Sequence, residues 1–195
     1  MTWKELMELL KNSKEAEEVD NKREDIASWI PAVREMFDYD QNSNYHQYDL
    51  WMHCIHTMLG IPKDIDDDML YLAALLHDIG KPKCRCKGDK DDSKSSYFGH
   101  QDVSEQIVRE EVIPYISNKG EHLSAGDIER LLYYVKYHDD RASLKEEYLL
   151  KHLKMVATDT FKKLMILEVA DAKAHAVYPA IQKRIDICSV LIERQ

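Results

Sequence analysis

The chain has 195 residues, only 6 glycines and 5 prolines, and a formal net charge of −9 at pH 7. A chain of this length can bury one well-formed core, and its composition favours helices over strands and hairpins, so we expect an all-α fold. The negative charge argues against broad binding to the phosphates of duplex nucleic acid. No apolar run approaches the ~18 residues that span a bilayer, and the first residues lack a signal-peptide profile. We therefore expect a cytoplasmic protein with no membrane partner.

The first half of the chain shows helical segments separated by turn signals. Thr2-x-x-Glu5 has the pattern of a capping box before an apolar stripe. A second segment, 24–37, contains Pro31, which either kinks the helix or restarts it. We expect a third helix over 47–59. After an acidic start, residues 69–76 are apolar nearly all round, as in a central buried helix.

The second half begins with residues 83–97, which lack periodicity and predict an exposed loop. A second capping-box pattern, Ser143-x-x-Glu146, marks the start of a later helix. Helices are expected over 101–115, 127–138, 144–155, 160–177 and 180–193.

The four cysteines are Cys54, Cys84, Cys86 and Cys188. In a non-secreted chain they are expected to be reduced thiols. Cys84 and Cys86 could hold zinc only with about two further ligands, and no second nearby pair supplies them. We therefore favour free thiols over a zinc site.

Histidine and aspartate side chains recur where the apolar pattern points inward. His77 and Asp78 follow the most hydrophobic segment, where polar side chains are unfavourable to bury without a partner. His53, His138 and Asp171 each continue an apolar stripe at helical spacing. A single inward histidine is more often a hydrogen-bonded core residue than a ligand, and a His-Asp pair can simply cap a helix. Four separate helices with this feature favour a shared metal ion over coincidence.

The order of these residues resembles a known family. His53, then His77-Asp78 within Leu75-Leu76-His77-Asp78-Ile79-Gly80-Lys81-Pro82, then Asp171 in Val169-Ala170-Asp171, is similar to the HD domain superfamily of metal-dependent phosphohydrolases. His100 in Gly99-His100 and His138 in Tyr137-His138-Asp139 match the additional histidines of family members that hold two metals. The resemblance implies a binuclear site whose ligands are His53, His77, Asp78, His100, His138 and Asp171.

More narrowly, residues 44–175 resemble the HD region of bacterial CCA-adding enzymes and related tRNA nucleotidyltransferases. Tyr45-His46 ahead of His53 and the segment 164–174 contribute to this likeness. The chain has no Gly-Ser followed by an Asp-x-Asp pair, the motif of a nucleotidyltransferase, so we do not expect nucleotide addition. Cys54 stands where the family usually has threonine, but the adjacent ligand is kept.

We expect one HD domain over 1–195. It would consist of a helical extension (1–43), a metal-binding core (44–177) and a C-terminal helix (178–195).

Oxygen and imidazole donors suit first-row divalent ions, and we expect one or two ions of Mn, Fe, Co, Ni or Zn. We expect Asp78 to bridge the two ions and so to be the central catalytic ligand. Metal coordination would lower the pKa of a bound water to about 7 and yield a hydroxide that attacks phosphorus. Lys81, three residues later, would offset transition-state charge on a substrate phosphate or serve as an ordinary cation at a helix C-terminus. His46 and Arg141 are further candidates for substrate binding. His175, one turn after Asp171, is a candidate positioning partner.

The expected function is hydrolysis of a small phosphoester: a nucleotide, a 2′,3′-cyclic nucleotide or another phosphomonoester or diester. The N-terminal segment with Trp3 and Trp29 offers a surface for a homodimer. Two other classes stay open. The same six ligands serve di-iron oxygenases in a minority of HD proteins, and the chain could also be a non-catalytic, metal-binding regulatory module.

Overall fold

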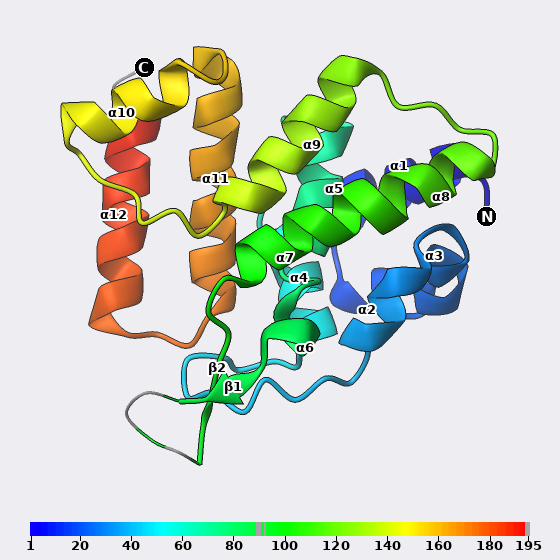
Figure 1. Ribbon diagram of the computed structural model, residues 1–195, viewed down its shortest axis with the longest axis horizontal. Coiled ribbons are helices and arrows are strands. Elements are labelled where there is room, and N and C mark those ends of the chain that lie inside the picture. The colour runs from blue at the N-terminus through cyan, green and yellow to red at the C-terminus, as the bar shows by residue number, and fades with distance from the viewer. Residues whose placement is uncertain (89–90, 92, 194–195) are drawn as a thin grey trace.

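The computed structural model describes residues 1–88, 91 and 93–193. Within these residues helices dominate, which confirms the predicted all-α fold (Figure 1). The α-helices are α1 (Trp3–Asn12), α2 (Ala16–Asp20), α3 (Arg23–Trp29), α4 (Leu50–Leu59), α5 (Asp68–Leu76), α6 (Lys81–Cys84), α7 (His100–Ile107), α8 (Ile113–Asn118), α9 (Ala125–Tyr137), α10 (Glu146–Leu153), α11 (Thr158–Ala174) and α12 (Pro179–Glu193). A 3₁₀ helix, η1 (Pro31–Met36), follows α3, and a π-helical turn, η2 (Val108–Val112), joins α7 to α8.

Helix α5 lies at the centre of the fold. Its residues 69–76 are all buried, because a helix that is apolar on every side must be covered by its neighbours. Helices α1, α4, α9 and α11 pack against it. Polar residues that directly follow α5 therefore lie in the interior of the protein.

The N-terminal helices follow the predicted signals. Thr2 Oγ1 accepts a hydrogen bond from the Glu5 amide, and a Glu5 carboxylate oxygen accepts one from the Thr2 amide, so this capping box is confirmed. The segment 24–37 is divided, since α3 ends before Pro31 and η1 begins at it. This outcome confirms the restart, because proline lacks the N–H that a continuous helix needs. Helix α2 was not predicted.

The second predicted capping box is wrong. Helix α10 begins at Glu146 with Lys145 as its N-cap, and the Ser143 hydroxyl accepts a hydrogen bond from the Lys145 amide at 3.3 Å. Ser143 thus forms a local turn two residues too early to cap the helix. A reciprocal box exists instead at the start of α9, between Ser124 and Asp127.

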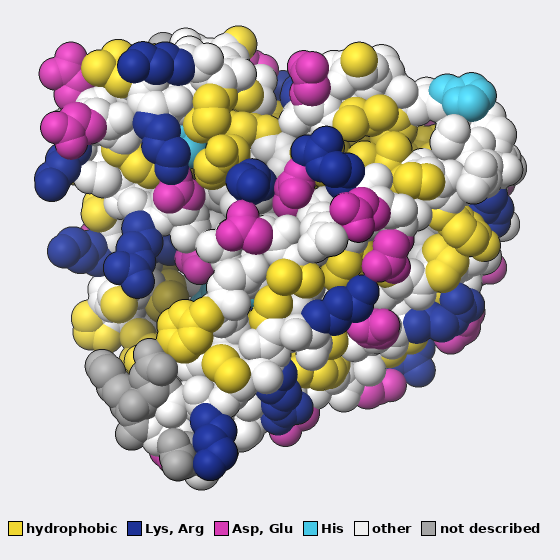
Figure 2. All heavy atoms as spheres, viewed as in Figure 1, with side chains coloured by type: hydrophobic (Ala, Val, Ile, Leu, Met, Phe, Trp, Pro, Cys, Tyr) yellow, Lys and Arg dark blue, Asp and Glu magenta, His cyan; other side chains and the backbone are white. Residues whose placement is uncertain are grey.

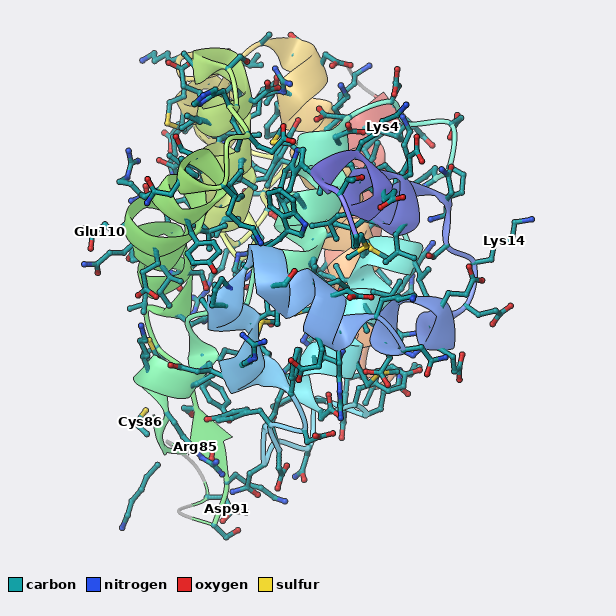
Figure 3. All side chains as sticks on the ribbon, turned by 90° about the vertical axis from the view of Figure 1, so that its right-hand side faces the viewer. Lys4, Lys14, Arg85, Cys86, Asp91 and Glu110 are labelled. Atoms are coloured by element: carbon teal, nitrogen blue, oxygen red, sulfur yellow. The ribbon has the colours of Figure 1, made fainter. Side chains whose placement is uncertain are left out.

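The segment predicted as a loop contains the end of α6 and a small hairpin of β1 (Cys86–Lys87) and β2 (Ser95–Ser96), paired antiparallel. Residues 89, 90 and 92 of that loop lie outside the described residues, as do the last two residues of the predicted C-terminal helix. Figure 3 shows Arg85 and Cys86 on the hairpin at the lower end of the molecule. The chain returns from the hairpin through Gly99, whose φ of 74° lies in the left-handed region open to glycine, and α7 begins at the next residue.

The four cysteines are free thiols, as predicted. Among the described residues, neither Cys84 nor Cys86 belongs to a group with metal-binding geometry. Nor does any described helix combine the length and hydropathy required to cross a membrane.

Candidate metal centre

All six predicted ligands converge beside the C-terminal end of α5. They come from α4, the turn after α5, the first residue of α7, the residue after α9, and α11: His53, His77, Asp78, His100, His138 and Asp171. Each of these side chains is buried. The residues suggested by inward periodicity, by their place after the apolar helix and, for His100, by the family resemblance therefore lie together in space.

One group of donor atoms lies between α4, α5 and α11. His53 Nε2 lies 3.0 Å from Asp171 Oδ1 and 3.5 Å from Asp78 Oδ2. His77 Nε2 lies 3.2 Å from Asp78 Oδ2 and 3.6 Å from Asp171 Oδ1. We call these four residues the first donor group.

A second donor group shares one residue with the first. Asp78 Oδ1 lies 3.1 Å from His100 Nε2 and 3.4 Å from His138 Nε2, and these two nitrogens are 3.1 Å apart. The two oxygens of Asp78 thus face different groups. This is the arrangement expected of a carboxylate that bridges two cations.

The donor set fits divalent metal ions. His53 Nε2, His77 Nε2, Asp78 Oδ1 and Asp171 Oδ1 are buried and have no hydrogen-bond partner, although buried polar atoms are normally satisfied. Metal–nitrogen and metal–oxygen bonds are about 2.0–2.2 Å long, so donors at roughly 90–110° around one ion lie about 3.0–3.5 Å apart. The donor separations match this spacing, and a cation would satisfy the unpartnered atoms.

Backbone hydrogen bonds orient three of the histidines. The Nδ1 atoms of His77, His100 and His138 each lie 2.7–2.8 Å from the carbonyl oxygen three residues earlier in the chain. An Nδ1–H that donates to a carbonyl leaves Nε2 as the atom with a free lone pair. In the neutral imidazole, each Nε2 therefore presents its lone pair to the donor groups.

Neighbouring cations keep both carboxylates ionised. Burial disfavours the charged form of Asp78, but Lys81, with Nζ 2.6 Å from Oδ2, and His77 together hold the pKa of that carboxyl well below its usual range. For Asp171, His175 and Arg184 likewise overcome burial and hold the pKa well below its usual range. Both side chains are thus anionic, as metal ligation requires.

The two histidines of the first donor group differ in protonation. Burial lowers the pKa of His53 to about 4, which leaves a neutral imidazole at neutral pH. At His77 burial acts in the same direction, but Asp78, Cys54 and Asp171 together outweigh it and raise the pKa well above its ordinary value. A metal ion that binds there therefore displaces a proton from His77.

A cavity of about 390 Å³ connects both donor groups to the surface, and it is lined by Lys81, His46 and Arg141, the three residues predicted to bind substrate. Figure 2 shows a hollow in this face beside the hairpin, with hydrophobic side chains at its rim. Lys81 is only 5% exposed and is the first residue of the four-residue helix α6. Its ammonium also donates to Gln41 Oε1 at 2.9 Å, a contact the sequence did not suggest.

His175 lies beside Asp171, as its spacing suggested. Its Nδ1 is 2.8 Å from the Asp171 carbonyl oxygen and 3.5 Å from Oδ1. His175 also forms a backbone bridge to His46, and these two rings adjoin His53. This contact ties the end of α11 to the segment that precedes α4.

Arg184 of α12 is another residue that the sequence reasoning missed. Its guanidinium donates to Glu168, to Asp171 and to the carbonyl oxygen of His138. A signal was present, since Arg184, Cys188 and Leu191 fall at i, i+4 and i+7 and so share one helix face.

The model of the HD domain family matches residues 45–175, about two thirds of the chain and all six converging residues. The chain belongs to the HD domain family. Members of the HD domain family are mostly metal-dependent hydrolases, and the clustered histidines and aspartates agree with their use of divalent metals. A search of the curated proteins and a search of the solved structures each gave no match.

Proposed function

We propose that this HD domain protein is a metal-dependent phosphohydrolase that cleaves a small phosphoester. The observation that carries the proposal is the set of buried, unpartnered donor atoms on His53, His77, Asp78 and Asp171, which open into a cavity lined by cations. Divalent ions bound there would act as Lewis acids and lower the pKa of water from 15.7 to about 7.

Different side chains would bind the metal ions and stabilise the phosphoryl group. His53, His77, Asp78 and Asp171 would hold one ion, and Asp78 with His100 and His138 would hold a second. Lys81, in the cavity wall, would stabilise negative charge on the phosphoryl group as it develops in the transition state. The low-dielectric surroundings of α5 strengthen each of these electrostatic interactions.

Phe98 supports a nucleotide as the substrate. It lines the cavity two residues before His100 and is 65% exposed, and no ring of the described residues packs against it. An exposed aromatic face beside a phosphate site suits a nucleobase, since stacking contributes about 1–3 kcal/mol per base. Arg141, exposed in the same cavity wall, would pair with a further phosphate or the base edge. The resemblance to the HD region of CCA-adding enzymes supports the same class, which includes 2′,3′-cyclic nucleotides.

A metal-by-substrate screen tests the proposal. Protein stripped with a chelator is reloaded with Mn²⁺, Co²⁺, Ni²⁺, Zn²⁺ or Fe²⁺ and assayed with nucleoside monophosphates, 2′,3′-cyclic nucleotides and p-nitrophenyl phosphates. We expect turnover that Asp78→Asn abolishes and that Asp102→Asn, an exposed matched control on α7, retains. Absence of metal-dependent turnover would overturn the hydrolase and favour a regulatory module. Two bound irons with O₂ consumption would favour the oxygenase.

A further inference from the structure

Helix α12 lies beyond the matched HD region yet reaches the metal centre. It packs along α11, the helix that carries Asp171 (Figure 1). All three nitrogens of its Arg184 side chain donate hydrogen bonds. Nε donates to Glu168 Oε2 at 3.0 Å, Nη1 to Asp171 Oδ2 at 2.9 Å, and Nη2 to the His138 carbonyl oxygen at 2.7 Å.

The bond to Asp171 determines which of its oxygens faces the first donor group. Nη1 of Arg184 occupies Oδ2, and the other oxygen, Oδ1, lies 3.0 Å from His53 Nε2 and 3.6 Å from His77 Nε2. A planar guanidinium holds a carboxylate in a defined orientation, unlike the point charge of a lysine. Arg184 therefore leaves Asp171 one free oxygen and directs it at the position of the ion.

The bond to His138 connects Arg184 to the second donor group as well. His138 directly follows α9, where the last carbonyl oxygens of a helix have no partner within it. Arg184 Nη2 binds the His138 carbonyl, and the imidazole of that residue places Nε2 3.4 Å from Asp78 Oδ1. One guanidinium thus contacts a residue of each donor group.

We propose that Arg184 is a positioning residue that sets the metal affinity of both donor groups, so that α12 is an integral part of the metal centre. The inference rests on the proposed function, since it takes the two groups to be metal sites. Arg184 also lines the cavity. Because each of its nitrogens already binds the protein, positioning of the ligands is favoured over direct contact with substrate.

The experiment measures metal binding without substrate. Mn²⁺ affinity and stoichiometry are determined by equilibrium dialysis, and the spin-coupled signal of a manganese pair by electron paramagnetic resonance. The variants are Arg184→Lys, Arg184→Met and the double variant Arg184→Met/Glu168→Gln, which also replaces the buried carboxyl group that would lose its partner. Lys183→Met, at the adjacent exposed position of α12, is the matched control.

We expect each Arg184 variant to bind Mn²⁺ about 10–100-fold more weakly and to lose the spin-coupled signal, whereas the control keeps both. Circular dichroism tests whether the variants are folded. If the methionine variants are unfolded, the metal affinity of Arg184→Lys decides between the outcomes. Affinity within twofold of the parent protein, together with a raised KM for substrate, would overturn positioning in favour of substrate contact. A parent protein that binds no divalent metal would instead overturn the proposed function itself.

Discussion

Replacing Asp78 with asparagine should abolish the stabilisation that divalent metal gives this protein. The two oxygens of Asp78 face different donor groups, 3.2 Å from His77 Nε2 on one side and 3.1 Å from His100 Nε2 on the other. Asparagine keeps the shape of the side chain but supplies one neutral oxygen and an NH₂ group that binds no cation. Both ions should therefore be lost together.

The size of the effect follows from linkage. An ion that binds only the folded state at about 100 times its Kd stabilises that state by about 2.7 kcal/mol. In a chain of about 200 residues each kcal/mol raises Tm by roughly 2–4 °C, so each ion should add about 5–11 °C. The parent protein should gain twice this amount from two ions. The double variant His100→Gln/His138→Gln, which keeps the first donor group, should gain about half as much as the parent.

The assay is a thermal melt of chelator-treated protein with and without Mn²⁺ or Zn²⁺, and the quantity compared is the metal-induced change in Tm. This difference is the correct measure, because Asp78→Asn also leaves the buried ammonium of Lys81 without its carboxylate and lowers the stability of the metal-free protein by about 3–5 kcal/mol. Asp102→Asn should behave as the parent does. A full metal-induced shift in Asp78→Asn would refute the assignment of Asp78 as the shared ligand.

Three further perturbations address other parts of the site. Phe98→Ala should raise KM for a nucleotide about tenfold through lost stacking and leave KM for glycerol 2-phosphate unchanged; equal effects on both substrates would contradict a base-binding role. Gly80→Ala would place a Cβ 2.6 Å from the Ser104 amide nitrogen. The free energy of unfolding should therefore fall by about 1–3 kcal/mol, and Tm should fall with it. An unchanged Tm would show that α7 can shift to accommodate the methyl group without a loss of stability. Burial raises the pKa of Glu168 to about 8. Between the ordinary glutamate pKa of 4.5 and this raised pKa, the folded metal-free protein therefore keeps a proton on Glu168 that the unfolded chain has lost. Its stability should fall as pH rises through that window, by up to about 1.4 kcal/mol per pH unit, and urea melts of Glu168→Gln should lack this slope.

The sequence predicted the side chains whose position depends on local periodicity. His53, His138 and Asp171 continue apolar stripes, and His77-Asp78 follows a helix that is apolar on every side, so burial of the helix face determined where they point. Their roles as ligands stay predictions until metal is measured.

Contacts that depend on tertiary packing were not accessible in this way. Gln41 reaches Lys81 from a stretch without helical periodicity, so no local pattern connects the two. Ser143 and Ser124 stand in similar Ser-x-x-acid patterns, and only the surrounding fold decides which of them caps a helix. Helix α2 has five residues, too few for an apolar stripe to be distinguished from chance.

The ligands of the first donor group are spread along the chain from His53 to Asp171, and no two of them except His77 and Asp78 are neighbours in sequence. An unfolded chain therefore offers a metal ion at most an adjacent pair, and closing the intervening loops around an ion carries a large entropic penalty. We therefore expect the apolar core around α5 to assemble first, and an ion to bind a site that folding has already built. Metal loading would then be a late step in maturation, and starvation for metal would leave a folded, inactive protein rather than an unfolded one.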